Sequence, residues 1–267
     1  MRNLLLLPLL LLVGSCVRQV PMETVPVGTE PDQAMTDGAP LTELDYGRFQ
    51  ILYDCALGEP HRFTYTIGPD TGSLERIDNF RVDQSLPAGC KGQISAKAYN
   101  SVPGFDRGHL APANHFDDSR QAMNASNLMT NIVPQIASHN RYTWGMTETL
   151  TECYREFGQV RVIGGVVFGS EPADLENDYF VETHGIATPE AFWKVLLAKD
   201  ATGNTQVIAW WIPHAAGLGS NLDPYVHSVA EVEALLGPYE PRIDVPEVLK
   251  HIRPATTWPR PAGCDTE

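Results

Sequence analysis

The sequence predicts a mixed α and β fold, and two patterns carry this prediction. Short runs of β-branched and aromatic residues recur between turn residues, as is typical of sheet strands. Between two such runs, residues 138–157 repeat apolar side chains at helical spacing. Residues 42–264 contain neither internal repeats nor a second linker, which favours one large domain with a substantial core.

Five segments are predicted as strands because they alternate or cluster apolar residues between turn residues. They are residues 48–53, 61–67, 160–168, 192–197 and 206–212. The turn between the first two is expected at residues 58–60. Trp210 and Trp211 lie in the last segment, where a packed core position is favoured over a platform for stacking bases.

Two helices are predicted, at residues 138–157 and 229–236, and each is followed by a glycine. The apolar stripe of the first comprises Tyr142, Met146 and Leu150. Its opposite face comprises Asn140, Trp144 and Glu148. If the stripe packs on the sheet, this opposite face can look across a cleft, and Trp144 is expected to line it.

The N-terminus has the features of an export signal. Arg2 precedes a short apolar run, and small residues come directly before Cys16, which resembles a bacterial lipobox. We therefore expect residues 1–16 to be a lipoprotein-type signal with Cys16 as the lipidated residue, although an ordinary cleaved signal is the alternative. Residues 17–41 are rich in Pro, Thr, Gly and acidic residues and are expected to form a flexible tether.

The remaining cysteines suggest disulfide bonds. An even number of cysteines without a CxxC pair in an exported chain favours two disulfides over a zinc site. These cysteines are Cys55, Cys90, Cys153 and Cys264. The sequence leaves all three connectivities open.

The chain carries a net charge of -14, and removal of the first fifteen residues takes away one further positive charge, that of Arg2. This balance argues against tight binding of nucleic acid over a broad surface, which draws on many Lys and Arg contacts to phosphate. It does not exclude cleavage, because one cation and a few arginines can supply a local positive field. Substrate binding is expected to be weak and sensitive to salt.

One histidine and one amide carry the chemistry. His109 follows Asp106, Arg107 and Gly108. Asn140 follows about thirty residues later, a separation that a hairpin and the start of a helix would bridge. A histidine that accepts a proton from water and an amide oxygen that holds a hard cation are what metal-assisted phosphodiester hydrolysis needs. On spacing alone, capping of the helix start remains the alternative role for Asn140.

Other polar residues are weaker candidates. Glu148 could position water held by a cation, or it could be a solvated helix charge. Asn131 could support the loop of His109. Three arginines besides Arg107 are candidates for phosphate binding by charge and neighbourhood, each with a surface ion pair as the alternative. They are Arg76, Arg81 and Arg141.

These motifs together resemble the DNA/RNA non-specific endonuclease family, the ββα-metal or His-Me finger nucleases that include endonuclease G. The resemblance rests on an ordered set of motifs and covers residues 46–239, where residues 226–237 resemble the family's late helix. The set comprises Asp106-Arg107-Gly108-His109, Ser126-Asn127, Thr130-Asn131-Ile132-Val133-Pro134-Gln135, Asn140, Trp144, Ala187-Thr188-Pro189 and Phe192-Trp193-Lys194-Val195.

The resemblance implies a central antiparallel sheet flanked by helices, with a ββα active-site motif. It implies His109 as the general base, Asn140 as the magnesium ligand and Glu148 as the carboxylate that positions water held by the cation, with Asn131 in support. Two departures concern positive charge. Asp78 and Glu152 occupy positions where the family usually has arginines.

The resulting hypothesis is a magnesium-dependent, or manganese-dependent, endonuclease that hydrolyses DNA and RNA without sugar specificity. It would be exported and anchored by lipid to a bacterial membrane, facing the periplasm or the cell exterior. A lipoprotein of the same fold that binds nucleic acid but has lost activity is one alternative. A phosphodiesterase acting on small molecules is another.

Overall fold

The computed structural model describes residues 35–36, 39–169, 175–238, 240–262 and 264. The expected signal, its lipidation site Cys16 and most of the expected tether lie outside the described residues. Within the tether, β1 (Met35–Thr36) and β2 (Ala39–Pro40) pair antiparallel with each other. In the described part of the chain, no helix has the length and apolar character that crossing a membrane requires.

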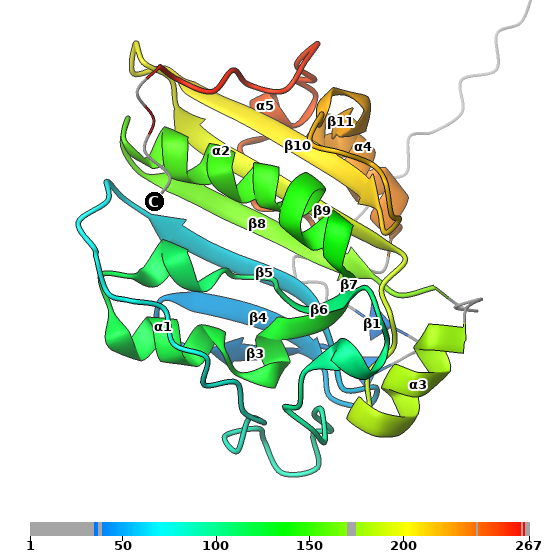
Figure 1. Ribbon diagram of the computed structural model, residues 1–267. Helices are drawn as coiled ribbons and strands as arrows, with labels where there is room; N and C mark the ends of the chain where they lie inside the picture. Colours follow the sequence, from blue (N-terminus) through cyan, green and yellow to red (C-terminus); the bar gives the residue numbers. More distant parts are fainter. Residues whose placement is uncertain (1–34, 37–38, 170–174, 239, 263, 265–267) are drawn as a thin grey trace, which may run out of the picture. The chain divides into compact units, whose positions relative to one another are not determined.

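A seven-stranded antiparallel sheet organises the domain and confirms the predicted fold class (Figure 1). Its strand order is β11-β10-β9-β8-β5-β4-β3. The strands are β3 (Thr42–Asp45), β4 (Phe49–Asp54), β5 (Glu59–Ile67), β8 (Val160–Val167), β9 (Ala191–Lys199), β10 (Thr205–Pro213) and β11 (Val226–His227). The expected turn at residues 58–60 is misplaced, because Glu59 and Pro60 already belong to β5 and the turn precedes them.

Both faces of the central strands are buried, which explains their nearly continuous apolar sequences. Val162 and Leu196 point into one core, whereas their neighbours Ile163 and Val195 point into a second core. Helix α2 (Gly145–Arg155) packs on β8 and β9, and its residues belong to the first core. Helices α4 (Val229–Leu236) and α5 (Glu247–Lys250) pack on β10 and contribute to the second core.

The ends of helix α4 are explained by its capping residues, whereas the periodicity of apolar residues did not reveal two other helices. Helix α4 begins and ends as predicted, because Ser228 and Glu231 form a capping box and Gly237 follows with a positive φ. Helices α1 (Arg120–Ser126) and α3 (Leu175–His184) were not predicted, since α1 is short and α3 does not gather its apolar residues on one side. The 3-10 helices are η1 (Tyr99–Ser101), η2 (Ala113–Phe116), η3 (Met129–Asn131) and η5 (Asp223–Tyr225).

The long helix predicted at residues 138–157 consists of two parts, and its first part faces differently than expected. It begins as the π-helix η4 (His139–Trp144) and continues as α2. Trp144 is fully buried against Phe63 and Phe192, whereas Tyr142 is 61% exposed, so the predicted roles of these two side chains are reversed. A π-helix bonds residue i to i+5, and its wider turn shifts the facing of residues away from α-helical spacing.

Two disulfide bonds fix peripheral segments to the domain. Cys55 pairs with Cys90, and Cys153 pairs with Cys264. The first joins the turn after β4 to the loop that leads toward the hairpin described below. The second joins α2 to a segment near the C-terminus, where Trp258 packs against Tyr154.

Candidate active site

A two-stranded hairpin and the helix after it build the candidate site. Strands β6 (Phe105–His109) and β7 (Ile132–Ile136) pair antiparallel, with Gly108 opposite Val133. A Cβ atom on Gly108 would lie 2.1 Å from Oε1 of Gln135, so only glycine permits this packing. With η4 and α2, the hairpin forms the ββα arrangement that the resemblance implies, and His109 lies at the end of β6.

Asn127 fixes the protonation state of His109. The Nδ2 of Asn127 donates to the Ile77 carbonyl at 2.9 Å and to Oδ1 of Asn79 at 2.6 Å. Its Oδ1 therefore faces Nε2 of His109, at 2.8 Å, and accepts a hydrogen bond from it, so Nε2 carries the hydrogen. This leaves Nδ1 of His109 as the basic nitrogen, with no hydrogen bond in the described part of the chain. Sequence reasoning assigned Asn127 no role.

The surroundings of His109 favour its neutral form. Its side chain is 6% exposed, and burial is the main reason that its pKa falls to about 3. The positive charge of Arg76 lowers the pKa further, and Arg107 adds a smaller effect, while the bond to Asn127 opposes them. His109 is therefore unprotonated, and able to accept a proton, throughout the neutral range.

Asn140 lines a pocket of about 600 Å³ beside the hairpin. Its Nδ2 donates to Oδ2 of Asp106 at 3.0 Å, which leaves Oδ1 available as a ligand atom. Phe80 lines the pocket, whereas His109 does not. The ring centroids of these two residues lie 5.2 Å apart. The pocket is lined by Arg76, Asp78, Phe80, Ala98, Tyr99, Phe105, Asp106, Arg107, Asn140 and Arg141.

The available ligand atoms suit a hydrated hard cation. Within the described residues, no three His, Cys, Asp or Glu side chains gather in a way that could hold a metal ion. This excludes a closed zinc-type site there. A single amide oxygen in an open pocket fits Mg²⁺, which keeps several water molecules and takes few protein ligands. Asn140 is the residue that would hold such an ion.

The candidate arginines differ in what they contact. Arg107 pairs with Asp78 at 3.0 Å and lies 3.6 Å above the Phe80 ring. Arg81 donates to the carbonyls of Asn79 and Asn124 and does not line the pocket. Arg141 donates two hydrogen bonds to Asp106. Arg76 lines the pocket and has no ion pair among the described residues.

Asn131 and Glu148 are not among the residues that line the pocket. Asn131 exchanges hydrogen bonds of 2.9 and 2.8 Å with the backbone of Ala111, two residues after His109, so it holds the end of β6 in place. Glu148 is half-buried on α2. Burial raises its pKa, and the charges of Lys194 and Arg76 oppose the rise, in that order of strength.

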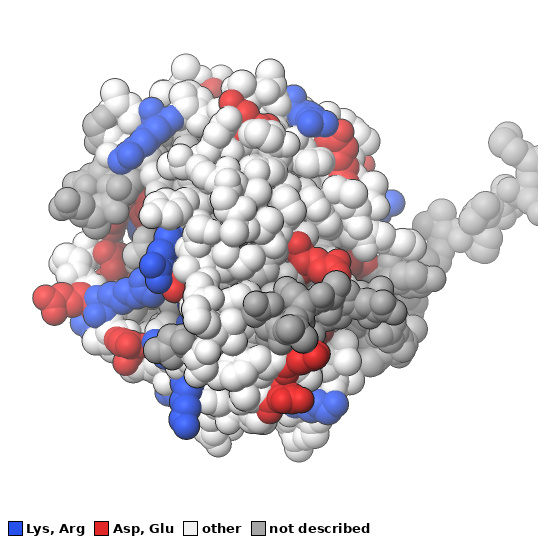
Figure 2. All heavy atoms as spheres, turned by 45° about the vertical axis from the view of Figure 1, so that its right-hand side comes forward, with Lys and Arg blue, Asp and Glu red and all other residues white. Residues whose placement is uncertain are grey.

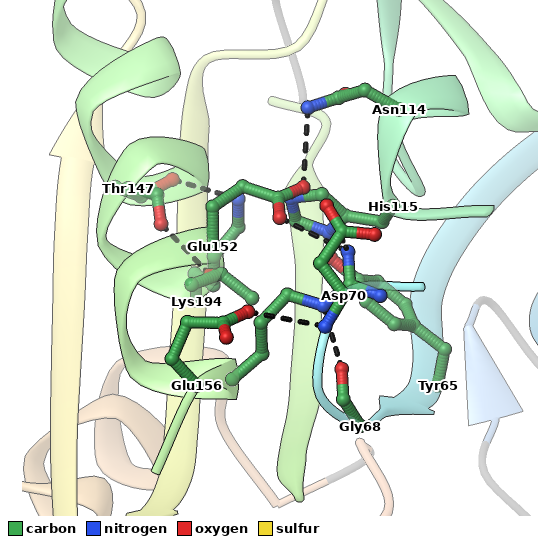
Figure 3. A network of polar contacts seen from close by, with 11 residues as sticks. Tyr65, Gly68, Asp70, Asn114, His115, Thr147, Glu152, Glu156 and Lys194 are labelled. Atoms are coloured by element: carbon green, nitrogen blue, oxygen red, sulfur yellow. Dashed lines mark hydrogen bonds and ion pairs between the residues drawn. The ribbon is translucent and has the colours of Figure 1, made fainter. Parts of the chain in front are cut away.

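Glu152 contacts two buried side chains, Arg155 and His115, which explains how a carboxylate replaces an arginine there (Figure 3). It accepts hydrogen bonds from Arg155 at 3.0 Å and from Asn114 at 3.3 Å, and lies 3.2 Å from Nε2 of His115. The other nitrogen of His115 bonds to the hydroxyl of Tyr65 at 2.7 Å. Burial still raises the pKa of Glu152 to about 7.

Charge on the visible surface is mixed. On the face drawn in Figure 2, Lys and Arg side chains lie among Asp and Glu side chains around a largely uncharged centre. A continuous basic band of the kind that binds long nucleic acid is not seen among the described atoms of this face.

Comparisons with known proteins identify the family. The model for DNA/RNA non-specific endonucleases matches residues 30–247. A nuclease from Nostoc sp. is 30% identical over 221 residues, which cover 79% of this chain and 76% of the relative. Human mitochondrial endonuclease G is 29% identical over 142 residues, which cover 51% and 47%.

A solved structure supports the same fold. A chain of the EndoG/EndoGI complex superimposes with a TM-score of 0.57 at 18% identity, over 79% of this chain and 90% of that chain. This likeness concerns the fold alone. The family match and the sequence relatives confirm the predicted family and the hydrolytic nuclease class. The chain belongs to the DNA/RNA non-specific endonuclease family.

Proposed function

We propose that the protein is a Mg²⁺-dependent endonuclease that hydrolyses both DNA and RNA, with His109 as its general base. The observation that carries this proposal is the fixed orientation of Asn127, which leaves Nδ1 of His109 as a free proton acceptor beside the pocket of Asn140. Manganese is the alternative ion. Acceptance of both sugars is supported by the family and by backbone-directed chemistry, which requires no reading of the bases.

The chain's residues divide the reaction between them. Nδ1 of His109 takes the proton of the attacking water as its oxygen bonds to phosphorus in line with the leaving group. Departure of the 3'-oxygen leaves a 5'-phosphate end. Oδ1 of Asn140 would hold the divalent cation, which when bound would supply positive charge against the scissile phosphate. Asp106 keeps that oxygen facing the pocket by accepting from Nδ2.

Arg76 is the residue that we assign to phosphate binding in place of the family arginine at position 78. It lines the pocket without an ion pair among the described residues, and it acts electrostatically on both His109 and Glu148. Arg107 and Arg141 would have to exchange a carboxylate partner for phosphate. A preorganised positive charge that needs no such exchange favours the charged transition state most.

We further propose that the enzyme is an exported lipoprotein, anchored through Cys16 and facing the periplasm or cell exterior. The support is the N-terminal sequence, together with two disulfide bonds that suit an oxidising environment.

The test uses supercoiled plasmid and single-stranded RNA, each with Mg²⁺ or with EDTA. We expect cleavage of both substrates with Mg²⁺, none with EDTA, and a loss of about 10²–10⁴-fold in His109→Ala. His251→Ala is the matched control, because the His251 side chain is 75% exposed and lies outside the pocket. A folded protein that binds but never cleaves nucleic acid would favour the inactive binding lipoprotein.

A further inference from the structure

Lys194 is a fully buried cation beside the helix that carries Glu148. It lies in β9, in the middle of the sheet, and its side chain has no solvent exposure. A lone ammonium in such a position is strongly unfavourable unless hydrogen bonds and a nearby negative charge compensate it. The reason for keeping a lysine there has to be found in its neighbours.

The neighbours of Lys194 flank Glu148 on the same helix. Nζ donates a hydrogen bond of 2.7 Å to Oγ1 of Thr147 (Figure 3). It also lies 3.8 Å from the ring centroid of Trp144. Thr147 directly precedes Glu148, and Trp144 lies one turn before it. Because Thr147 and Trp144 lie one and four residues before Glu148, these contacts place the ammonium on the part of α2 that carries Glu148.

Charges on the other packed elements leave Lys194 as the main buried partner of Glu148. Tyr65 on β5 and His115 on η2 are held neutral by burial, which raises the pKa of the tyrosine and lowers that of the histidine. On α2 itself, Glu152 is matched by Arg155 at 3.0 Å. Arg76 supplies a second positive charge, but it is exposed at the pocket, where solvent screens it.

We propose that Lys194 is a positioning residue for the nuclease reaction, whose buried ammonium, held on α2 by Thr147 and Trp144, is the buried positive charge that acts on the Glu148 carboxylate. The effect of Lys194 on the reaction rests on the proposed function. The coupling between the charges of Lys194 and Glu148 does not. The family arginine at position 152 is absent here, so positive charge reaches Glu148 from the sheet instead of from the next helical turn. Burial lowers the pKa of Lys194 to about 8, and Glu148 opposes this fall.

The coupling can be measured without metal or substrate. Carboxyl ¹³C NMR would follow the titration of Glu148 in the metal-free protein, with its signal assigned by its absence from Glu148→Gln. We expect Lys194→Met to raise the pKa of Glu148, because the methionine removes the nearby positive charge. An unchanged titration of Glu148 in this variant would overturn the proposal.

Lys250→Met is the matched control. Lys250 is 4% exposed and pairs with Glu233 at 2.7 Å on the other face of the sheet. Its loss removes a buried lysine and one charge, as Lys194→Met does, but should leave Glu148 unchanged. A rise of equal size in both variants would indicate a general effect of net charge and would refute the specific pairing.

A reciprocal measurement serves if Lys194→Met does not fold. Glu148→Gln leaves Lys194 in place, and ¹⁵N NMR of Nζ should show its pKa falling below that in the wild type. A constant Lys194 titration would again refute the coupling.

In active protein, the acid limb of kcat/KM should move to higher pH in Lys194→Met, with activity recovering as pH rises, and should stay in place in Lys250→Met. A coupled pair in a protein without any nuclease activity would refute the proposed function while the pairing itself stands.

Discussion

The two sides of helix α2 and its hairpin carry charge in different ways. On the pocket side, Arg141 bonds to Asp106 and Arg107 pairs with Asp78, whose side chain is 77% exposed. On the inner side, Arg155 is 2% exposed and its partner Glu152 is 9% exposed. Solvent screens the outer pairs, so they can be exchanged for a substrate phosphate at little cost. The inner charges lack that freedom, and removing one partner leaves the other uncompensated.

The largest effect is expected from breaking an inner pair. Arg155→Leu should lower the free energy of unfolding by about 3–5 kcal/mol, because Glu152 is left buried without its cation. Urea unfolding at neutral pH measures this loss. Arg161→Leu is the control, since Arg161 pairs with an exposed Asp244 at 2.6 Å and exposed pairs contribute about 0–1 kcal/mol. Equal losses would remove the distinction between inner and outer pairs.

The next effect concerns the hydrogen bond between Asn127 and His109, the proposed general base. Asn127→Ala should lose part of the about 10²–10⁴-fold that a positioned general base contributes, because both tautomers of His109 become accessible. Imidazole ¹⁵N NMR should show Nε2 protonated in the wild type and a mixture in the variant. Ser126→Ala removes a neighbouring buried bond to the Met123 carbonyl and should leave the tautomer unchanged. A single tautomer in Asn127→Ala would refute this role.

The smallest effect is expected in the pocket. Asp78→Asn should lower KM for nucleic acid by about two- to fivefold with kcat nearly unchanged, because Arg107 is released to bind phosphate. Asp244→Asn changes net charge equally, at an exposed ion pair with Arg161, and serves as control. If both variants lower KM alike, the effect comes from net charge and not from Arg107.

The sheet could be predicted from sequence more fully than the helices. All five predicted strands are present, because strands buried on both faces leave long apolar runs that few other structures explain. Helix α4 was predictable from its cap and its terminal glycine. Strands β6 and β7 are short and mixed in polarity, and they were found only through the motif around His109. The π-helix could not be anticipated from α-helical spacing, so Trp144 and Tyr142 were assigned to the wrong faces.

The candidate site was predictable where a motif carried it. His109 and Asn140 come from elements that fold against each other, with Asn131 and Asp106 bonded beside them. Lys194 and Asn127 were given no role because nothing local distinguishes them. A lysine within the apolar run of β9 acquires its partner only when α2 packs on the sheet. The same holds for Asn127, whose partner His109 is 18 residues away in the chain.

The disulfide bond between Cys153 and Cys264 makes the stability of the fold depend on oxidation, and it does so at the helix that carries Glu148. Cys264 lies outside the residues that match the family, and its bond closes a separation of 111 residues. Closing a loop of this size stabilises a fold by roughly 4–5 kcal/mol through the unfolded state. A chain that is still being synthesised, or is kept reduced, lacks this contribution. The stability of the domain that carries Glu148 therefore depends on an oxidising environment.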